Sequence, residues 1–236
     1  MGVSVVSRRA ETNLAAGVGH GINMRNQGLY VKIGKRLVDL AVAIPALALL
    51  TPLMATICGA ILLLMGRPVF FRQQRSGLHG EPFRLLKFRS MLDVRDETGG
   101  PLPDCERMTQ FGRFLRSWSL DELPQLWSVL LGDLSLIGPR PLLVGYEKYY
   151  TPRQARRLKV RPGLAGYAAL FGRNAQSWEN IFERDVWYVD HVSFGLDVEI
   201  MLKLIPLVLS RRGIERGDHD RGSPFAEALG QSSRQT

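Results

Sequence analysis

The longest hydrophobic stretch of the chain runs from Leu40 to Gly66, 27 residues without a charged side chain. A helix of this length can cross a bilayer, but Pro52 divides the stretch into halves of 12 and 14 residues. Each half reaches ~18–21 Å, which is short of a hydrocarbon core of ~30 Å. The pattern therefore predicts a re-entrant helical hairpin over residues 31–66. It would bend at Thr51 and Pro52, where the threonine hydroxyl can bond a carbonyl group at the bend.

Basic residues flank this stretch on both sides: Lys32, Lys35 and Arg36 precede it, and Arg67, Arg72 and Arg75 follow it. Because positively charged flanks favour the cytoplasmic side, both ends are expected there, as a hairpin in one leaflet requires. The alternative is a proline-kinked helix that crosses the bilayer with some tilt. A wholly buried helix of a soluble protein is disfavoured, because the rest of the chain can hardly enclose it.

After residue 67 the pattern changes to short strand-like and helical segments. Two strand-like runs, at 69–74 and 82–91, surround a glycine turn and predict a β-hairpin. Helices are predicted over 111–118, 147–160, 178–189 and 196–209, the last with a hydrophobic stripe suited to the membrane interface or to core packing. The expected fold is α+β and mainly helical, in a monotopic membrane protein. Its parts are a disordered N-terminal arm (1–30), the hairpin (31–66), a cytoplasmic domain (67–215) and a flexible tail (216–236).

The charge composition narrows the choice of ligand. The chain carries a formal net charge of +9, and arginine supplies 25 of its 31 basic residues. Arginine is favoured where phosphate or carboxylate is bound through two parallel hydrogen bonds, so nucleic acid, anionic lipid and phosphorylated small molecules are the candidate partners. The two cysteines and four scattered histidines support neither a disulfide framework nor a zinc site, so any metal should be held by oxygen.

Adjacent carboxylates, Asp121 and Glu122, precede a hydrophobic helical run, with Arg116 a short distance upstream. Because Pro124 is tolerated only in the first turn of a helix, the helix is expected to begin near Asp121 and to place both acids at its positive end. A carboxylate among arginines should stay ionised at neutral pH, which suits a nucleophile or a metal ligand in phosphate chemistry. The structural alternative is helix capping, since Ser119 and Glu122 have the spacing of a capping box.

The chain contains no dinucleotide-binding glycine motif and no Walker loop, so a nucleotide would need another phosphate cradle. Two candidates are a Gly-Pro-Arg-Pro corner at residues 138–141 and a glycine-containing loop at residues 161–174. On the second arm of the predicted β-hairpin, Lys87 and Arg89 lie on one face of the two-residue alternation. These segments are the expected surroundings of the acid pair.

Six segments in order along the chain carry a family resemblance: KRLVDL (35–40), the Thr-Pro pair (51–52), LLKFRSM (85–91), RSWSLDELPQLWSVLLGDLSLIGPRPLL (116–143), RPGLAGYAALFGRN (161–174) and FERDVWYVDHVSFGLDVEIM (182–201). With them the chain resembles the bacterial sugar transferases, monotopic polyprenyl-phosphate phosphoglycosyl transferases, from about residue 31 to residue 213. It departs from many relatives at 166–169, which read Gly-Tyr-Ala-Ala in place of Gly-Trp-Ala-Gln. That difference leaves the identity of the sugar open.

The resemblance implies that the 67–215 domain is catalytic and moves a sugar 1-phosphate from a UDP-sugar to undecaprenyl phosphate. Asp121 would be the nucleophile on the β-phosphate, with release of UMP, and Glu122 would assist by activating the incoming lipid phosphate. Mg²⁺ would bridge Asp121 and the diphosphate. The residues expected to bind substrate are Lys87, Arg89, Arg116, Gly138, Pro139, Arg140, Pro141, Arg161, Gly163, Arg173 and Asn174.

Such an enzyme would begin polysaccharide or glycoconjugate synthesis at the cytoplasmic face of the bacterial inner membrane. Its expected partners are membrane lipids and, as a further option, a second copy of the chain in a homodimer. The rival hypothesis is a membrane-anchored basic protein that binds nucleic acid or acts as a scaffold, as the charge of +9 suggests. It is disfavoured because the chain shows no recognisable nucleic-acid module and its basic residues are not gathered on one recognition helix.

Overall fold

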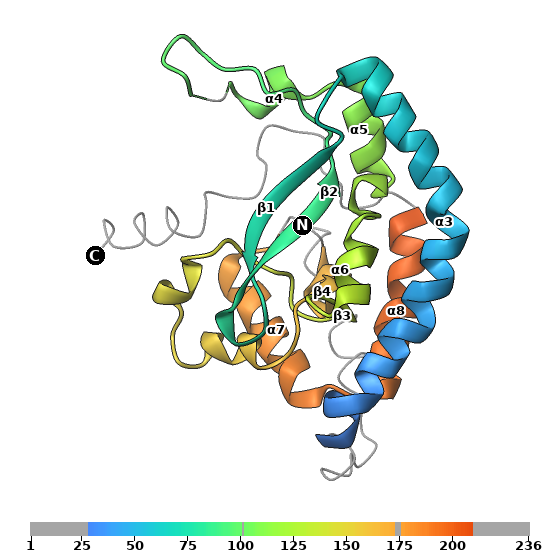
Figure 1. The fold of residues 1–236 in the computed structure, drawn as a ribbon. Helices are drawn as coiled ribbons and strands as arrows, with labels where there is room; N and C mark the ends of the chain where they lie inside the picture. Colours follow the sequence, from blue (N-terminus) through green and yellow to red (C-terminus); the bar gives the residue numbers. More distant parts are fainter. Residues whose placement is uncertain (1–27, 101, 173–175, 210–236) are drawn as a thin grey trace, which may run out of the picture.

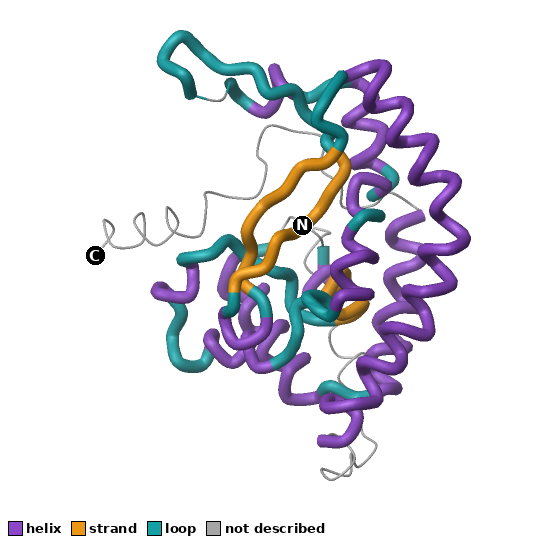
Figure 2. Tube along the Cα trace, viewed as in Figure 1, coloured by secondary structure: helices purple, strands orange, loops and turns teal. Residues whose placement is uncertain are grey.

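The computed structural model describes residues 28–100, 102–172 and 176–209. The predicted arm and tail, together with Arg173 and Asn174, lie outside these residues, except for the last few residues of the arm. The elements that position the site are a π-helical turn (Tyr30–Gly34), α3 (Lys35–Met65), β1 (Phe70–Ser76), β2 (Pro82–Phe88), α4 (Asp104–Arg107), α5 (Gln110–Ser117), α6 (Gln125–Leu131), β3 (Ser135–Ile137), β4 (Gly163–Ala165), α7 (Trp178–His191) and α8 (Phe194–Leu209). The predicted α+β, mainly helical fold with a small β-hairpin is confirmed (Figures 1 and 2).

Helix α3 bows along one side of the molecule and lies against α6 (Figure 1). Pro45 and Pro52 lie inside it without ending it, so the predicted hairpin appears as one continuous helix. The Thr51 hydroxyl donates to the carbonyl of Leu47 over 2.6 Å. Because Pro52 has no N–H, the carbonyl of Ala48 lacks its usual helical partner. The carbonyl of Leu47, which Thr51 bonds, is that of the preceding residue. Together with the preceding turn, α3 forms one 36-residue helical segment that is long and apolar enough to cross a membrane.

The two sides of α3 differ in burial, and the exposed side is not the more polar one. A stripe with helical spacing is buried against the rest of the chain: Lys35, Asp39, Ala43, Leu47, Met54, Ile57 and Ile61. The opposite side is exposed and still hydrophobic, with Leu49 at 80% and Leu63 at 88% exposure. A soluble helix would carry polar residues there. The exposed side of α3 is therefore suited to an apolar surrounding.

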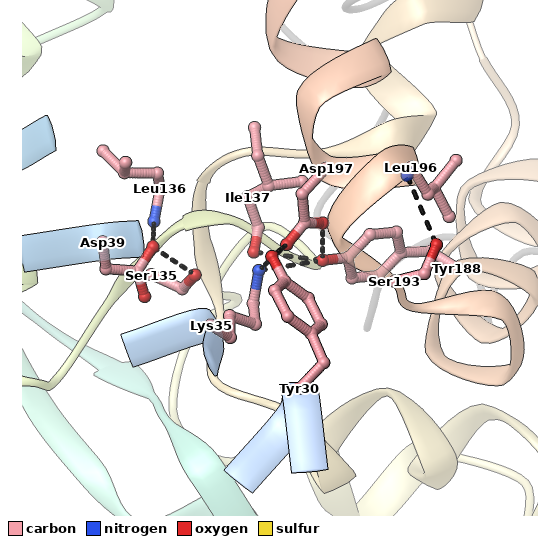
Figure 3. A network of polar contacts seen from close by, with 10 residues as sticks. All are labelled: Tyr30, Lys35, Asp39, Ser135, Leu136, Ile137, Tyr188, Ser193, Leu196 and Asp197. Atoms are coloured by element: carbon pink, nitrogen blue, oxygen red, sulfur yellow. Dashed lines mark hydrogen bonds and ion pairs between the residues drawn. The ribbon is translucent and has the colours of Figure 1, made fainter. Parts of the chain in front are cut away.

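Buried polar contacts fix the beginning of α3 to the C-terminal helices (Figure 3). The Lys35 ammonium lies 2.6 Å from the Asp197 carboxylate at the start of α8 and donates to the Tyr188 hydroxyl on α7 over 3.1 Å. The hydroxyls of Tyr30 and Tyr188 donate to the two carboxylate oxygens of Asp197, each over 2.6 Å. The buried charges are thus paired and hydrogen-bonded, as burial requires.

One turn further along α3, Asp39 reaches β3. Its carboxylate accepts from the Ser135 hydroxyl at 3.0 Å and from the Leu136 backbone N–H at 2.9 Å. The neighbouring Arg36 donates to the carbonyls of Val129 and Leu130 in the last turn of α6. The KRLVDL segment therefore joins the beginning of α3 to α6, β3 and the C-terminal helices.

Arg89 holds the other end of α3. Its guanidinium donates to the carbonyl of Gly66 over 2.7 Å and to that of Arg67 over 3.0 Å, and it also contacts the carbonyl of Met65. The prediction that Arg89 binds substrate is not supported by this position. The strand ends at Phe88, so Arg89 leaves the alternation that would have placed it beside Lys87.

The sheet elements are small. Strands β1 and β2 form the predicted antiparallel hairpin, in which Phe70 lies opposite Phe88 and Ser76 opposite Pro82. Strands β3 and β4 pair in parallel, which joins the segment after α6 to the glycine-containing loop (Figure 2). The sequence pattern did not predict this second pairing, because two strands of three residues carry too few side chains to show an alternation.

Helices α5, α7 and α8 confirm the predictions at 111–118, 178–189 and 196–209. The predicted helix at 147–160 is wrong: two 3₁₀ segments, Tyr146–Tyr149 and Gln154–Lys159, occupy this region. Pro152 explains the difference, because a proline disfavours helical backbone at the residue before it and lacks the N–H that an interior helical position needs.

Candidate active site

The acid pair lies in a 3₁₀ turn, Leu120–Glu122, between α5 and α6. The expectation that a helix begins near Asp121 is wrong, because α6 begins at Gln125 and Pro124 occupies its N-cap position. Ser119 adopts left-handed backbone with φ of 55° and its side chain caps nothing. The capping-box explanation of the two acids is therefore excluded.

Glu122 is the centre of an ion triad. The Lys87 ammonium lies 2.6 Å from a Glu122 oxygen, and the Arg140 guanidinium lies 3.1 Å from the same oxygen. Burial alone would raise the pKa of Glu122, but Arg140 and Lys87 outweigh burial and hold the pKa well below its ordinary value. Burial in turn lowers the pKa of Lys87, against the opposing effect of Glu122. We call Lys87, Glu122 and Arg140 the ion triad.

Asp121 differs from its neighbour although both acids share the same cations. Its residue is 6% exposed, and burial raises the pKa of its carboxyl although Lys87, Arg116 and Arg140 act in the opposite direction. The expectation that cations alone would set its ionisation thus missed the cost of burial. The two adjacent acids therefore differ in environment: Glu122 is held in ion pairs with Lys87 and Arg140, whereas Asp121 carries the cost of burial.

Arg116 lies in the last turn of α5, and contacts with Ser90 and Met91 orient its guanidinium near the acid pair. Its Nε donates to the Ser90 hydroxyl over 3.0 Å, and Nη2 lies 3.3 Å from the Met91 sulfur. Its charge lowers the pKa of Asp121 against the larger effect of burial. The structure therefore brings Lys87, Arg116 and Arg140 to the acid pair, as the sequence predicts.

The Gly-Pro-Arg-Pro corner and the glycine-containing loop form one unit. The Gly138 N–H donates to the Ala165 carbonyl and the Gly163 N–H to the Pro139 carbonyl, both over 2.9 Å. A Cβ on Gly138 would lie 2.5 Å from the Arg161 carbonyl oxygen, and one on Gly163 would lie 2.1 Å from the Gly138 nitrogen. At both positions the lack of a side chain lets one backbone segment pack directly against the other.

A buried ion pair between Arg157 and Asp185 holds the backbone of the Gly-Pro-Arg-Pro corner. The Arg157 guanidinium lies 2.7 Å from the Asp185 carboxylate of α7, and both side chains are 2% exposed. The same guanidinium donates to the Arg140 carbonyl over 2.7 Å. Arg140 is thus held by its main chain from one side while its side chain reaches Glu122.

The remaining residues predicted to bind substrate are distributed differently. Arg161 donates to the Gly132 carbonyl over 2.9 Å and so closes the end of α6. Pro139 and Pro141 are buried in the corner, which leaves Arg140 as its exposed member. Two residues that were not predicted as binding residues, Arg75 of β1 and Gln125 of α6, line a pocket with Lys87 and Arg140.

The donor set limits how a metal could bind. Across the described ranges, no group of three or more His, Cys, Asp or Glu residues is arranged to hold a metal ion. Both cations contact the same oxygen of Glu122, and no ion pair among the described residues engages the Asp121 carboxylate, which is the acid that the resemblance assigns to the metal. Mg²⁺ commonly uses one or two carboxylates, water and substrate phosphates, and the arrangement fits that mode.

A buried carboxylate beside lysine and arginine is an arrangement suited to phosphate chemistry, and the same chain carries a helix long and apolar enough to cross a membrane. The comparison with known families agrees with this class. Residues 30–211 match the model of the bacterial sugar transferase family, and the chain belongs to that family.

Named relatives extend the comparison. An uncharacterized sugar transferase, EpsL, of Bacillus subtilis is 52% identical over 191 residues, which are 81% of this chain and 95% of the relative. A UDP-glucose:undecaprenyl-phosphate glucose-1-phosphate transferase of Caulobacter vibrioides is 39% identical over 190 residues, 76% of this chain and 71% of the relative. The exopolysaccharide production protein ExoY of Sinorhizobium fredii is 35% identical over 198 residues, 77% of this chain and 88% of the relative.

Proposed function

We propose that this sugar-phosphate transferase moves a sugar 1-phosphate from a UDP-sugar to undecaprenyl phosphate through a covalent intermediate on Asp121, with release of UMP. The family and the names of relatives support sugar-phosphate transfer to a polyprenyl phosphate. The observation that carries the finer proposal is the contrast within the acid pair. Glu122 is neutralised by Lys87 and Arg140, whereas Asp121 is buried with a raised pKa beside the same cations.

In the first step an Asp121 carboxylate oxygen attacks the β-phosphorus of the donor. The bond between that phosphorus and the bridging oxygen breaks, and UMP leaves with the oxygen and the electron pair. In the second step a phosphate oxygen of the lipid attacks the same phosphorus, which forms the lipid diphosphate sugar and restores the carboxylate. Two steps separate two anionic substrates that would otherwise have to meet directly.

The cations of the site have a defined place in this scheme. Lys87 and Arg140, held by Glu122, and Arg116, held by Ser90, would neutralise charge on the phosphate oxygens as it develops. The low pKa of Glu122 makes it a poor proton acceptor, which favours a role in positioning Lys87 and Arg140 over activation of the lipid phosphate. Mg²⁺ held by Asp121 and the diphosphate would supply further charge neutralisation.

We further propose that α3 anchors the enzyme in one leaflet of the bacterial inner membrane, from the cytoplasmic face. Both ends of α3 are tied to the catalytic part, through Lys35 and Asp197 at one end and Arg89 at the other. A helix that crossed the bilayer would carry its far end away from these contacts. Exposed hydrophobic side chains at the end of α5 and on α6 and α8, which include Trp118, Trp127 and Phe194, suit the interface between water and lipid.

The proposal is tested with Asp121→Asn in a UMP-release assay with a UDP-sugar and undecaprenyl phosphate. We expect release to fall by several orders of magnitude, because the substituted amide is a poor nucleophile. Asp133→Asn is the matched control, since Asp133 is exposed beyond the end of α6 and should leave the rate unchanged. Incubation with a donor labelled in the sugar should label residue 121. An active Asp121→Asn enzyme, or a label on another residue, would refute the covalent step.

A further inference from the structure

Arg89, at the end of β2, is a buried arginine without a carboxylate partner. It is 9% exposed, and in the ranges that the structure describes no acidic side chain lies within ion-pair distance of its guanidinium. Its Nε is buried and makes no hydrogen bond with these residues. Because buried charges in proteins are usually paired, the position of Arg89 requires another source of stabilisation.

Backbone carbonyls at the end of α3 take the place of a counter-ion. Nη1 of Arg89 donates to the Arg67 carbonyl over 3.0 Å, and Nη2 donates to the Gly66 carbonyl over 2.7 Å and to the carbonyl of Met65. The last carbonyls of a helix lack helical partners and form the negative end of its dipole, so they stabilise a nearby cation. Arg89 is therefore a cap of α3 that is supplied by another part of the chain.

The same short segment, residues 87–91, also holds two cations of the site. Lys87, two residues before Arg89, belongs to the ion triad and forms its ion pair over 2.6 Å. Ser90, the residue after Arg89, accepts a hydrogen bond from Nε of Arg116 at 3.0 Å. We call residues 87–91 the coupling segment, because it contacts the end of α3 and both cations.

The coupling segment is tightly packed between these contacts. Phe88 is 1% exposed, and its ring stacks on that of Phe70 with the centroids 5.5 Å apart. A Cβ on Gly112 of α5 would lie 1.8 Å from the Ser90 carbonyl oxygen, so α5 packs with its backbone directly on the segment. Because close-packed groups transmit displacement, a shift at one contact of the segment should reach the others.

We propose that Arg89 is a positioning residue for the transfer reaction: by capping α3 it fixes the coupling segment, and through it the places of Lys87 and Arg116 beside the acid pair. Arg89 itself touches no substrate in this scheme. The inference rests on the proposed function for the task of the two cations, which is to neutralise phosphate oxygens. A misplacement of about 1 Å by a change far from the chemistry can cost about 100-fold in rate, so the cap can matter greatly for catalysis.

The test measures transfer of a labelled sugar phosphate from a UDP-sugar to undecaprenyl phosphate by the full-length protein in detergent. Arg89→Met keeps an unbranched side chain and removes all donors, whereas Arg89→Lys keeps the charge but cannot reproduce the planar fork. We expect kcat to fall by about 100-fold in Arg89→Met and by less in Arg89→Lys. All assays are run below the lowest melting temperature of the set, and Arg89→Lys takes the place of Arg89→Met if the latter does not fold.

A double-mutant cycle separates positioning from stability. In Lys87→Met and in Ser90→Ala, one connection between the coupling segment and the site is already broken. Adding Arg89→Met to either variant should therefore reduce kcat by a factor about fivefold smaller than in wild type, because residues that act as a unit are not additive. A purely structural role predicts the same factor in all three backgrounds, and that result would overturn the proposal.

Arg107→Met is the matched control. Nε of Arg107 also donates to a backbone carbonyl, that of Leu92, over 3.0 Å, and its Nη1 lies 3.7 Å from Asp104. Within the described ranges it bonds neither α3 nor a cation of the site, so kcat should equal that of wild type. A loss as large as that of Arg89→Met would contradict the special place of Arg89. The readout does not depend on the covalent step, so an active Asp121→Asn enzyme would refute the proposed function and leave the cycle measurable.

Discussion

The substitution Asp185→Asn tests how the catalytic corner is supported. Asp185 on α7 and Arg157 form an ion pair in which both side chains are 2% exposed. The amide has nearly the shape of the carboxylate, so the change leaves no cavity but leaves the Arg157 charge without its counter-ion. Because Arg157 also donates to the Arg140 carbonyl over 2.7 Å, the perturbation reaches a residue of the ion triad.

The magnitude follows from the burial of the pair. Breaking a buried ion pair by removing one partner costs about 3–5 kcal/mol. For a chain of this size, 1 kcal/mol lowers the melting temperature by roughly 2–4 °C, so a decrease of about 6–20 °C is expected. Glu183→Gln is a close control, because Glu183 pairs with Arg153 across the same two elements but the two side chains are 56% and 65% exposed. An exposed pair contributes about 0–1 kcal/mol.

Thermal unfolding followed by tryptophan fluorescence, in one detergent for all three proteins, measures both effects. UMP release below the melting temperature should also fall in Asp185→Asn, since Arg140 loses the support of Arg157. Equal melting temperatures in Asp185→Asn and Glu183→Gln would refute the reasoning that burial sets the value of this pair. A large loss of stability with unchanged kinetics would show that Arg157 does not position Arg140.

Further predictions concern the reactive acid, the metal and the anchor. Burial raises the pKa of Asp121, so its ionised form destabilises the folded protein at neutral pH. Asp121→Asn should therefore raise the melting temperature at neutral pH. This gain should disappear as the pH falls through the raised pKa, because the wild-type carboxyl then takes up a proton. The acid limb of the pH–kcat/KM profile should lie above the range of an ordinary aspartate, because Asp121 must be ionised to attack. Treatment with EDTA should abolish UMP release and Mg²⁺ should restore it, whereas a rate unaffected by EDTA would contradict the proposed ion. Asp39→Ala leaves the Ser135 hydroxyl and the Leu136 N–H without their acceptor, which should cost about 1–3 kcal/mol for each group in chemical unfolding.

The sequence predicted the elements whose signals are local. The hydrophobic run at 40–66, the β-hairpin and α5, α7 and α8 each follow from a pattern within one segment. The region 147–160 failed because its basic residues suggested one helical surface, while Pro152 interrupts the backbone between two 3₁₀ segments. The pairing of β3 with β4 joins residues that are far apart in the chain, so no local pattern could reveal it.

The arginine excess was only partly a signal of phosphate binding. Arg36 and Arg89 donate to carbonyls at the ends of α6 and α3, and Arg161 donates to the Gly132 carbonyl beyond α6. Arg157 donates to the Arg140 carbonyl. The planar guanidinium suits this task as well as it suits phosphate, since it offers several donors in fixed directions. Composition cannot distinguish the two uses, because the carbonyl partners are set by the tertiary fold.

The acid pair is a second case in which the tertiary fold, and not the local sequence, decides what each residue does. The residue pattern places Asp121 and Glu122 together, and only the family resemblance gave them different roles, because adjacent acids share the same cations. In the structure Glu122 forms ion pairs with Lys87 and Arg140. Asp121 forms neither ion pair, and burial raises the pKa of its carboxyl. The difference between the two acids therefore depends on which of them Lys87 of the hairpin and Arg140 of the corner contact, and that is set by the tertiary fold.

Helix α3 connects this chemistry to the proposed anchor. Its buried residues, which include Ala43, Leu47 and Ile61, belong to the main hydrophobic core together with Leu115 of α5 and Val129 of α6. The two helices that flank the acid pair therefore pack into the same core as the helix whose other side is exposed and hydrophobic. A displacement of α3 would have to move α5 and α6, because a close-packed core transmits displacement instead of absorbing it. The depth at which a bilayer holds α3 would accordingly fix the height of Asp121, which is the requirement for a carboxylate that must meet a phosphate carried by a lipid.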